Sequence, residues 1–236
     1  MPKRLALLAI ALFMIAPTTA AGAPTALSPD SGKALRTAAA ARPLLEWELP
    51  EGEQACQVNL SRDKARPTGV LAGEVTHGLQ SDATAFRVRA PLAAGKWFWE
   101  IASRVPTEED LGHGIDCYEE PLLTSPLRSV VVPYVLRSVR AGAVFHYGEQ
   151  TQYYTVKFWT TADDALVTII AKHGSTLYFS GVSDGESSPW KTNTVRLGWE
   201  LSSSIPCGQK FNVVVTVKAG PKVEKLYAYD NYFTCT

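Results

Sequence analysis

The chain of 236 residues has no excess charge of either sign, because 23 lysines and arginines balance 23 aspartates and glutamates. Blocks of basic residues are absent as well. A nucleic-acid-binding surface or a polybasic membrane patch is therefore not indicated, since both need many cations close together. Beyond Ala23 no apolar run approaches the length of a membrane span. We expect no nucleic-acid partner and no membrane span in the mature chain.

The sequence also lacks the common motifs of catalysis and metal binding. It contains no HExxH motif and no phosphate-binding loop. Its four cysteines form no CxxC pair, so neither a zinc ribbon nor a thioredoxin-type site is indicated. We expect no catalytic residue, no metal ligand and no cofactor, and therefore a protein that is not an enzyme.

The amino-terminal segment has the three parts of a secretory signal peptide. A basic head with Lys3 and Arg4 precedes an apolar stretch from Leu5 to Ala16, which is too short to cross a bilayer. Small residues then follow as far as Ala23. The sequence therefore predicts a cleaved signal peptide over residues 1–23, and a protein that is secreted, periplasmic or located at the cell surface.

After this segment helical periodicity is nearly absent. Short runs alternate between apolar and polar residues and are separated by Gly, Pro, Ser and Asp, which is typical of β-sandwiches. Pro133 ends one series of such runs and a second series begins near Leu136. The sequence predicts an all-β protein with two tandem β-sandwich domains, residues 24–133 and 134–236. The expected strands span residues 44–48, 56–61, 86–88, 97–101 and 130–132, and then 153–160, 166–171, 176–180, 194–201, 211–218 and 223–233.

Three segments of the first half resemble a fibronectin type III module. They are SPDSG from Ser28 to Gly32, PLLEW from Pro43 to Trp47, and LAAGKWFWEI from Leu92 to Ile101. The family has a tryptophan on its second strand, and a Leu-x-x-Gly corner before a Tyr-x-Trp-x-Val strand. The resemblance covers about residues 26–133. The second half resembles no particular family, and we expect an immunoglobulin-like sandwich there.

The resemblance implies roles for three tryptophans. It places Trp47 and Trp99 in the core, where we expect them not to contact ligand. Trp97 stands where the family usually has its corner tyrosine. The hydrogen bond of that corner must then come from an indole, or be missing.

Two disulfides are expected, because four cysteines in an exported chain make an even set. In a fibronectin-like sandwich, the strand that Cys56 opens and the loop that holds Cys117 meet at one end of the domain. The resemblance therefore implies a Cys56–Cys117 bridge. Cys207 and Cys235 lie almost equally far from an expected hairpin turn at Ala219–Lys222, which predicts that they pair.

The expected ligand-binding residues are aromatic side chains of the second half: Trp159, Trp190, Tyr227 and Tyr229. Exposed flat rings stack on sugars or anchor protein partners. The alternative is that these rings belong to ordinary strands, which are rich in aromatic residues. A register shift of one residue would move every ring of a strand to the other face.

The long segment 104–126 of the first half is a second candidate binding surface. It holds six carboxylates between Glu108 and Glu120, together with His113. A calcium site is one interpretation, but the spacing matches no known ligand loop, so we expect a solvated acidic loop. Asn59 begins an Asn-Leu-Ser acceptor sequence for glycosylation, yet it lies in the middle of an expected strand.

These features favour an exported, non-enzymatic binding or adhesion protein whose partner is a protein or a glycan at the cell surface. The first alternative is a carbohydrate-binding accessory module. The second is a small secreted hydrolase with an unrecognised site.

Overall fold

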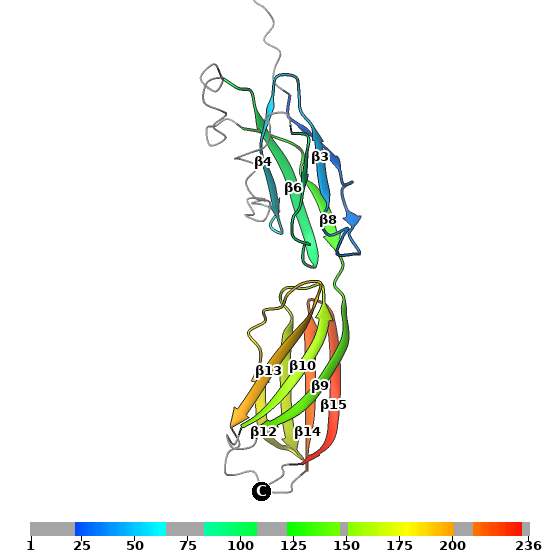
Figure 1. Ribbon diagram of the computed structural model, residues 1–236, viewed down its shortest axis with the longest axis vertical. Helices are drawn as coiled ribbons and strands as arrows, with labels where there is room; N and C mark the ends of the chain where they lie inside the picture. Colours follow the sequence, from blue (N-terminus) through cyan, green and yellow to red (C-terminus); the bar gives the residue numbers. More distant parts are fainter. Residues whose placement is uncertain (1–21, 65–82, 108–121, 147–150, 201–209, 233–236) are drawn as a thin grey trace, which may run out of the picture.

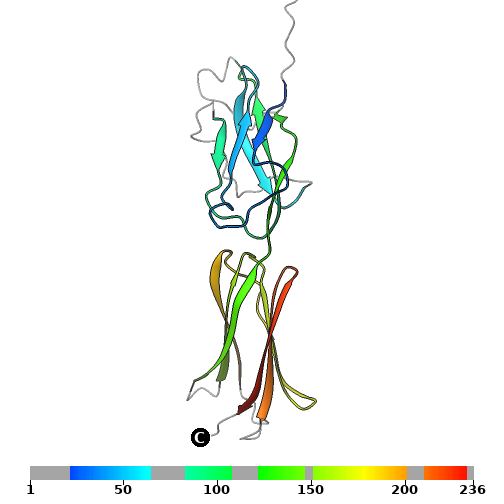
Figure 2. The ribbon, with the colours of Figure 1, turned by 90° about the vertical axis from the view of Figure 1, so that its right-hand side faces the viewer.

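The computed structural model shows two β-sandwiches arranged end to end (Figure 1). The view turned by 90° shows the two sheets of the second sandwich as separate layers (Figure 2). The structure describes residues 22–64, 83–107, 122–146, 151–200 and 210–232. All regular elements in these ranges are β-strands, which confirms the predicted all-β sandwich fold. Among these residues no helix is long and apolar enough to span a membrane.

Strands β1 to β8 form the first sandwich. One of its sheets has the order β1-β3-β5, and the other has the order β2-β8-β6-β4, with β7 paired to β6. The strands are β1 (Thr25–Ser28), β2 (Lys33–Ala34), β3 (Leu44–Glu48), β4 (Gln54–Ser61), β5 (Ala85–Arg87), β6 (Gly95–Arg104), β7 (Leu123–Thr124) and β8 (Arg128–Val132). The five strands expected in this half are present. The additional strands β1, β2 and β7 are short and have little alternation from which to predict them.

The core of the first sandwich contains the tryptophans that the resemblance placed there. Trp47 and Trp99 are 1% and 0% exposed, which confirms them as core residues. Trp97 is buried too, and its Nε1 donates a hydrogen bond to the carbonyl oxygen of Ala93 at 2.9 Å. Of the two possibilities for the corner, the indole bond is therefore the one that the structure forms.

Strands β9 to β15 form the second sandwich. Its two sheets have the orders β13-β10-β9 and β12-β11-β14-β15. The strands are β9 (Leu136–His146), β10 (Thr151–Thr160), β11 (Leu166–His173), β12 (Thr176–Val182), β13 (Lys191–Glu200), β14 (Lys210–Ala219) and β15 (Lys222–Tyr232). The chain enters this sandwich through residues 133–135, between β8 and β9.

Alternating apolar residues fill the space between these two sheets. The inward faces of β10 and β14 contribute buried side chains at every second position: Tyr154, Val156, Phe158, Phe211, Val213, Val215 and Val217. The expected alternation along both strands is thus confirmed. β14 and β15 form the predicted hairpin, in which Ala219 pairs with Lys222 and Gly220 has φ of 55°.

Candidate functional site

The outer face of the three-stranded sheet carries basic side chains. On β10, Lys157 lies between the buried Val156 and Phe158, and therefore points away from the core. Arg140 of β9 is the cross-strand partner of Lys157. Since cross-strand partners share a face of the sheet, the two cations stand side by side on the outside.

Two further arginines belong to the same surface. Arg137 of β9 lies opposite Trp159, and Arg196 of β13 lies opposite Thr155. Trp159 and Thr155 are each two positions from the outward-pointing residue 157, so all of them share its face. We call Arg137, Arg140, Lys157 and Arg196 the basic face.

A β-bulge places both arginines of β9 on this face. Arg137 and Arg140 are separated by an odd number of positions, and in a regular strand they would point to opposite sides. Their partners Trp159 and Lys157 are separated by an even number, so β9 holds one extra residue at this point. Ser138 accommodates it with φ of 57°, in the left-handed region.

The described residues contain no carboxylate that neutralises the basic face. β9, β10 and β13 hold a single acidic residue among them, Glu200 at the end of β13. The ion pair that the described residues form joins Arg62 to Asp163, next to the first sandwich. The basic face therefore presents its positive charge to solvent, where dissolved salt screens it and no carboxylate of the described residues pairs with it.

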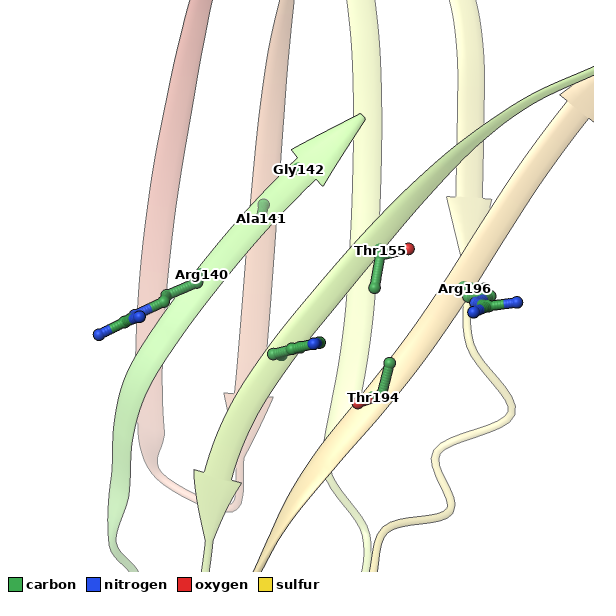
Figure 3. Close-up of a pocket in the computed structure, with 7 residues that line it drawn as sticks. Arg140, Ala141, Gly142, Thr155, Thr194 and Arg196 are labelled. Atoms are coloured by element: carbon green, nitrogen blue, oxygen red, sulfur yellow. The ribbon is translucent and has the colours of Figure 1, made fainter. Parts of the chain in front are cut away.

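A shallow, open depression of about 610 Å³ lies within the basic face. Figure 3 shows Arg140 and Arg196 on either side of Thr155 and Thr194. A Cβ atom added at Gly142 would meet no other atom within 4 Å, so no side chain covers this part of the surface. The lining residues are Arg140, Ala141, Gly142, Thr155, Lys157, Thr194 and Arg196.

Trp159 lies on the same surface, but a cation covers its ring. The guanidinium carbon of Arg137 is 3.9 Å from the ring centroid of Trp159. Trp190 packs edge-on against the same indole, with the centroids 6.0 Å apart and the planes at 83°. One face of the Trp159 ring is thus occupied by a cation–π contact and is not free to stack on a sugar.

Trp190 connects the two sandwiches. Its Nε1 donates to the carbonyl oxygen of Leu92, in the corner of the first sandwich, at 2.7 Å. Its backbone N–H donates to the carbonyl oxygen of Thr160 at 2.7 Å, and its φ is 62°. A large residue adopts such a backbone conformation only when its surroundings hold it there. These contacts identify Trp190 as a residue of the domain junction.

The same junction contains a second group of polar contacts. Ala94 donates its N–H to the carbonyl oxygen of Thr161 at 2.8 Å. Arg62 forms its ion pair with Asp163 at 2.9 Å, and its guanidinium lies 4.9 Å from the ring centroid of Trp97. Hydrogen bonds and an ion pair therefore cross between the sandwiches.

The four aromatic residues expected to bind ligand do not form one surface. Trp159 and Trp190 lie near the junction, at one end of the three-stranded sheet. Tyr227 lies on β15, in the other sheet, where 55% of its surface is exposed. Tyr229 is also on β15, and its side chain lies outside the described residues.

Several expectations concern residues that the structure does not describe. Cys117, Cys207, Cys235, the acidic segment 108–121 and residues 1–21 lie outside the described ranges. Cys56 is fully buried on β4, and the described residues include no free cysteine. The two disulfide pairings and the signal peptide therefore stay predictions. Asn59 lies in the middle of β4, and its Nδ2 donates to Glu100 Oε1 at 3.1 Å.

One sequence pattern, around Ser183, has a structural context that differs from that of a catalytic serine. Gly181 to Gly185 match Gly-x-Ser-x-Gly, a pattern that marks a nucleophile where a strand turns into a helix. Here Ser183 follows β12 and no helix begins after it. Its Oγ accepts the N–H of Val167 at 3.0 Å, and its own N–H donates to the carbonyl of Val167 at 2.9 Å. Ser183 thus holds the segment after β12 against Val167 of β11 through two hydrogen bonds. In the described ranges no group of three His, Cys, Asp or Glu residues could hold a metal ion.

The residues that sequence reasoning missed are those of the basic face. They are distributed one or two to a strand, so they form no basic block in the sequence. The bulge at Ser138 also breaks the alternation from which a shared face would be predicted. Only the pairing of β9, β10 and β13 brings these cations together.

Comparison with known proteins provides no functional identification. No protein-family model matches the chain, and no curated protein matches it. Among solved structures, the chain is similar to the chicken interferon gamma receptor alpha chain, with 11% identity, a TM-score of 0.27, and coverage of 89% of this chain and 99% of the receptor chain.

Two bacterial structures also match over most of this chain. One is dimeric latent PorU from Porphyromonas gingivalis, with 13% identity, a TM-score of 0.26, and coverage of 89% of this chain and 20% of that one. The other is the beta-glucuronidase of Parabacteroides merdae, with 10% identity, a TM-score of 0.22, and coverage of 80% and 22%. The chain spans about a fifth of the length of these two proteins. Similarities this low carry no argument about function.

Proposed function

We propose that the protein is an exported, non-enzymatic binding protein that holds an anionic ligand on the basic face. The observation that carries this proposal is the grouping of Arg137, Arg140, Lys157 and Arg196 on one exposed surface. Arg140 and Lys157 are direct cross-strand partners, and like charges in that position destabilise a sheet. An anion bound between them would relieve this repulsion, so the arrangement is better suited to a bound state than to the free protein.

The chemistry of the depression supports binding rather than proton transfer. Arginine is not deprotonated in proteins, so Arg140 and Arg196 can hold an anion but cannot act as bases. Thr155 and Thr194 offer hydroxyl groups, and the lining residues include neither a histidine nor a carboxylate; the one amine among them is that of the exposed Lys157. A hydroxyl needs an adjacent base to become a nucleophile.

The test is binding of the mature protein to immobilised polyanions at low and at high salt. The triple substitution Arg140→Gln, Lys157→Gln and Arg196→Gln should weaken binding about tenfold, because each of the three exposed charge pairs contributes about 0.5 kcal/mol. The matched control replaces three exposed lysines of the other sheet by Gln: Lys172, Lys218 and Lys225. The proposal is wrong if the two triple variants bind equally well, or if the wild-type protein binds no polyanion.

A further inference from the structure

We infer that the anionic ligand is an extended acidic polysaccharide, whose carboxylates lie on the basic face and whose hydroxyls contact Thr155 and Thr194. This inference rests on the proposed function and specifies the class of ligand.

The shape of the site favours a polymer over a small molecule. Small ligands bind in concave, mostly apolar pockets that enclose most of their surface. The depression here is shallow, and its cations come from three different strands, with Arg140 on β9, Lys157 on β10 and Arg196 on β13. Adjacent strands are about 4.8 Å apart, so these charges are distributed over about 10 Å across the sheet. A chain with charges at intervals can meet all three at once.

The hydroxyl groups of Thr155 and Thr194 match the hydroxyl groups that an acidic sugar carries besides its carboxylate. Thr194 is the cross-strand partner of Lys157, and Thr155 is the partner of Arg196, so each hydroxyl adjoins a cation. A hydroxyl both donates and accepts hydrogen bonds, as sugar hydroxyls do. The guanidinium group of an arginine can hold a carboxylate with two parallel hydrogen bonds. The alternation of hydroxyls and cations thus resembles that of a uronate chain.

Two other classes of anionic polymer fit the site less well. An acidic peptide that adds to a sheet binds along an edge strand, which here is β9 or β13, whereas the depression extends over all three strands and across the central β10. Single-stranded nucleic acid needs free aromatic rings on which its bases stack. Among the side chains that the structure describes, the aromatic ring on this surface is that of Trp159, and Arg137 covers one of its faces.

The experiment compares four probes by calorimetry or biolayer interferometry. They are an oligogalacturonate, the same oligomer with its carboxylates reduced to alcohols, poly-glutamate, and single-stranded DNA. The wild-type protein should bind the oligogalacturonate and lose at least about tenfold in affinity for the reduced form. Equal binding of the two sugars, or tighter binding of poly-glutamate or DNA than of the oligogalacturonate, would overturn the inference.

A second pair of variants separates the inference from the proposed function. The double substitution Thr155→Val and Thr194→Val keeps every charge and should weaken oligogalacturonate binding about fivefold, because two hydrogen bonds are lost. Binding of poly-glutamate should not change. The matched control is Thr168→Val with Thr216→Val, a cross-strand pair of the other sheet.

If the threonine variant binds the sugar as the wild type does, while the basic-face triple variant loses poly-glutamate, the inference fails and the proposed function stands. If the basic-face triple variant binds every polyanion as the wild type does, both fail. Circular dichroism and thermal unfolding should show that both sets of surface variants are folded.

Discussion

Single residues of the same type have different roles in this protein, and the tryptophans of the first sandwich show it best. The indole nitrogens of Trp47 and Trp97 donate to the carbonyl oxygens of Ala83 and Ala93, each at 2.9 Å. Trp99 is fully buried, and its Nε1 has no hydrogen-bond partner. Its contribution is therefore purely one of apolar packing.

We predict that Trp97→Phe lowers the free energy of unfolding more than Trp99→Phe does, by about 1 kcal/mol. Both changes leave a cavity of similar size, but only the first also leaves a buried carbonyl without its donor. Urea unfolding of the two variants measures the difference. An equal or larger loss for Trp99→Phe would show that the corner bond of Trp97 contributes nothing.

Tyr154 makes the stability of the second sandwich depend on pH. Burial raises the pKa of its phenol from 10.0 to about 12. Because the folded-state pKa lies above that of the unfolded chain, the stabilisation is complete below about pH 10 and is lost as the pH rises through 12. We predict that Tyr154→Phe loses less stability between these two pH values than the wild type does. The exposed Tyr227→Phe is the control, and the midpoint of urea unfolding at both pH values is the measurement.

At the scale of single elements, the bulge of β9 decides which side chains this strand presents to solvent. Ser138 is held at φ 57°, where a side chain is unfavourable by about 1–2 kcal/mol compared with glycine. Val has a branched side chain and tolerates this conformation least.

We predict that Ser138→Gly leaves the protein as stable as the wild type or slightly more so, and that Ser138→Val lowers the free energy of unfolding by about 2 kcal/mol. Guanidinium unfolding of the two variants tests this order. If valine is tolerated as well as glycine, β9 has a regular register and the basic face loses one of its arginines.

The hairpin of β14 and β15 bears on one of the two expected disulfides. Its register pairs Lys210 with Tyr232. Cys207 precedes Lys210 by as many residues as Cys235 follows Tyr232. We predict the bridges Cys207–Cys235 and Cys56–Cys117, each contributing about 2–4 kcal/mol to stability. Peptide mapping without reductant should recover both links, whereas a Cys56–Cys207 link would contradict them.

At the scale of the whole molecule, the junction makes the two sandwiches one unit. Tandem domains usually move relative to each other unless their interface is substantial. Here buried apolar residues of both sandwiches belong to one continuous cluster. Polar contacts of Arg62, Ala94 and Trp190 supplement it.

We predict that the double substitution Arg62→Gln and Trp190→Phe loosens this junction without unfolding either sandwich. It removes the ion pair with Asp163 and the hydrogen bond to Leu92, but keeps a ring in place of the indole. Small-angle X-ray scattering should show a broader distribution of overall dimensions than for the wild type. Asp164→Asn, at the exposed neighbour of Asp163, is the control and should leave the scattering unchanged.

The sequence alone determined most of the strands and the apolar alternation that fills the cores of this protein. The period-2 pattern of Val213, Val215 and Val217 predicted both a strand and its buried face, because alternation along a strand is a local property. The resemblance to the fibronectin type III module likewise predicted that the first sandwich buries Trp47 and Trp99. Strands β1, β2, β7 and β9 escaped prediction. β2 and β7 are two residues long and form only by pairing with partners distant in the sequence, and the bulge at Ser138 breaks the alternation of β9.

Tertiary structure alone decided which charged and polar side chains lie next to each other. The cations of the basic face come from three strands that are separated in sequence, and a bulge that no local pattern marks brings both arginines of β9 to the same face. Tertiary structure likewise forms the junction between the sandwiches, where Arg62 and Asp163 make an ion pair although they are 101 positions apart in the sequence. Local sequence determines which face of a strand is apolar. Strand pairing and register determine which outward side chains become neighbours, and in this protein those neighbours form the candidate site.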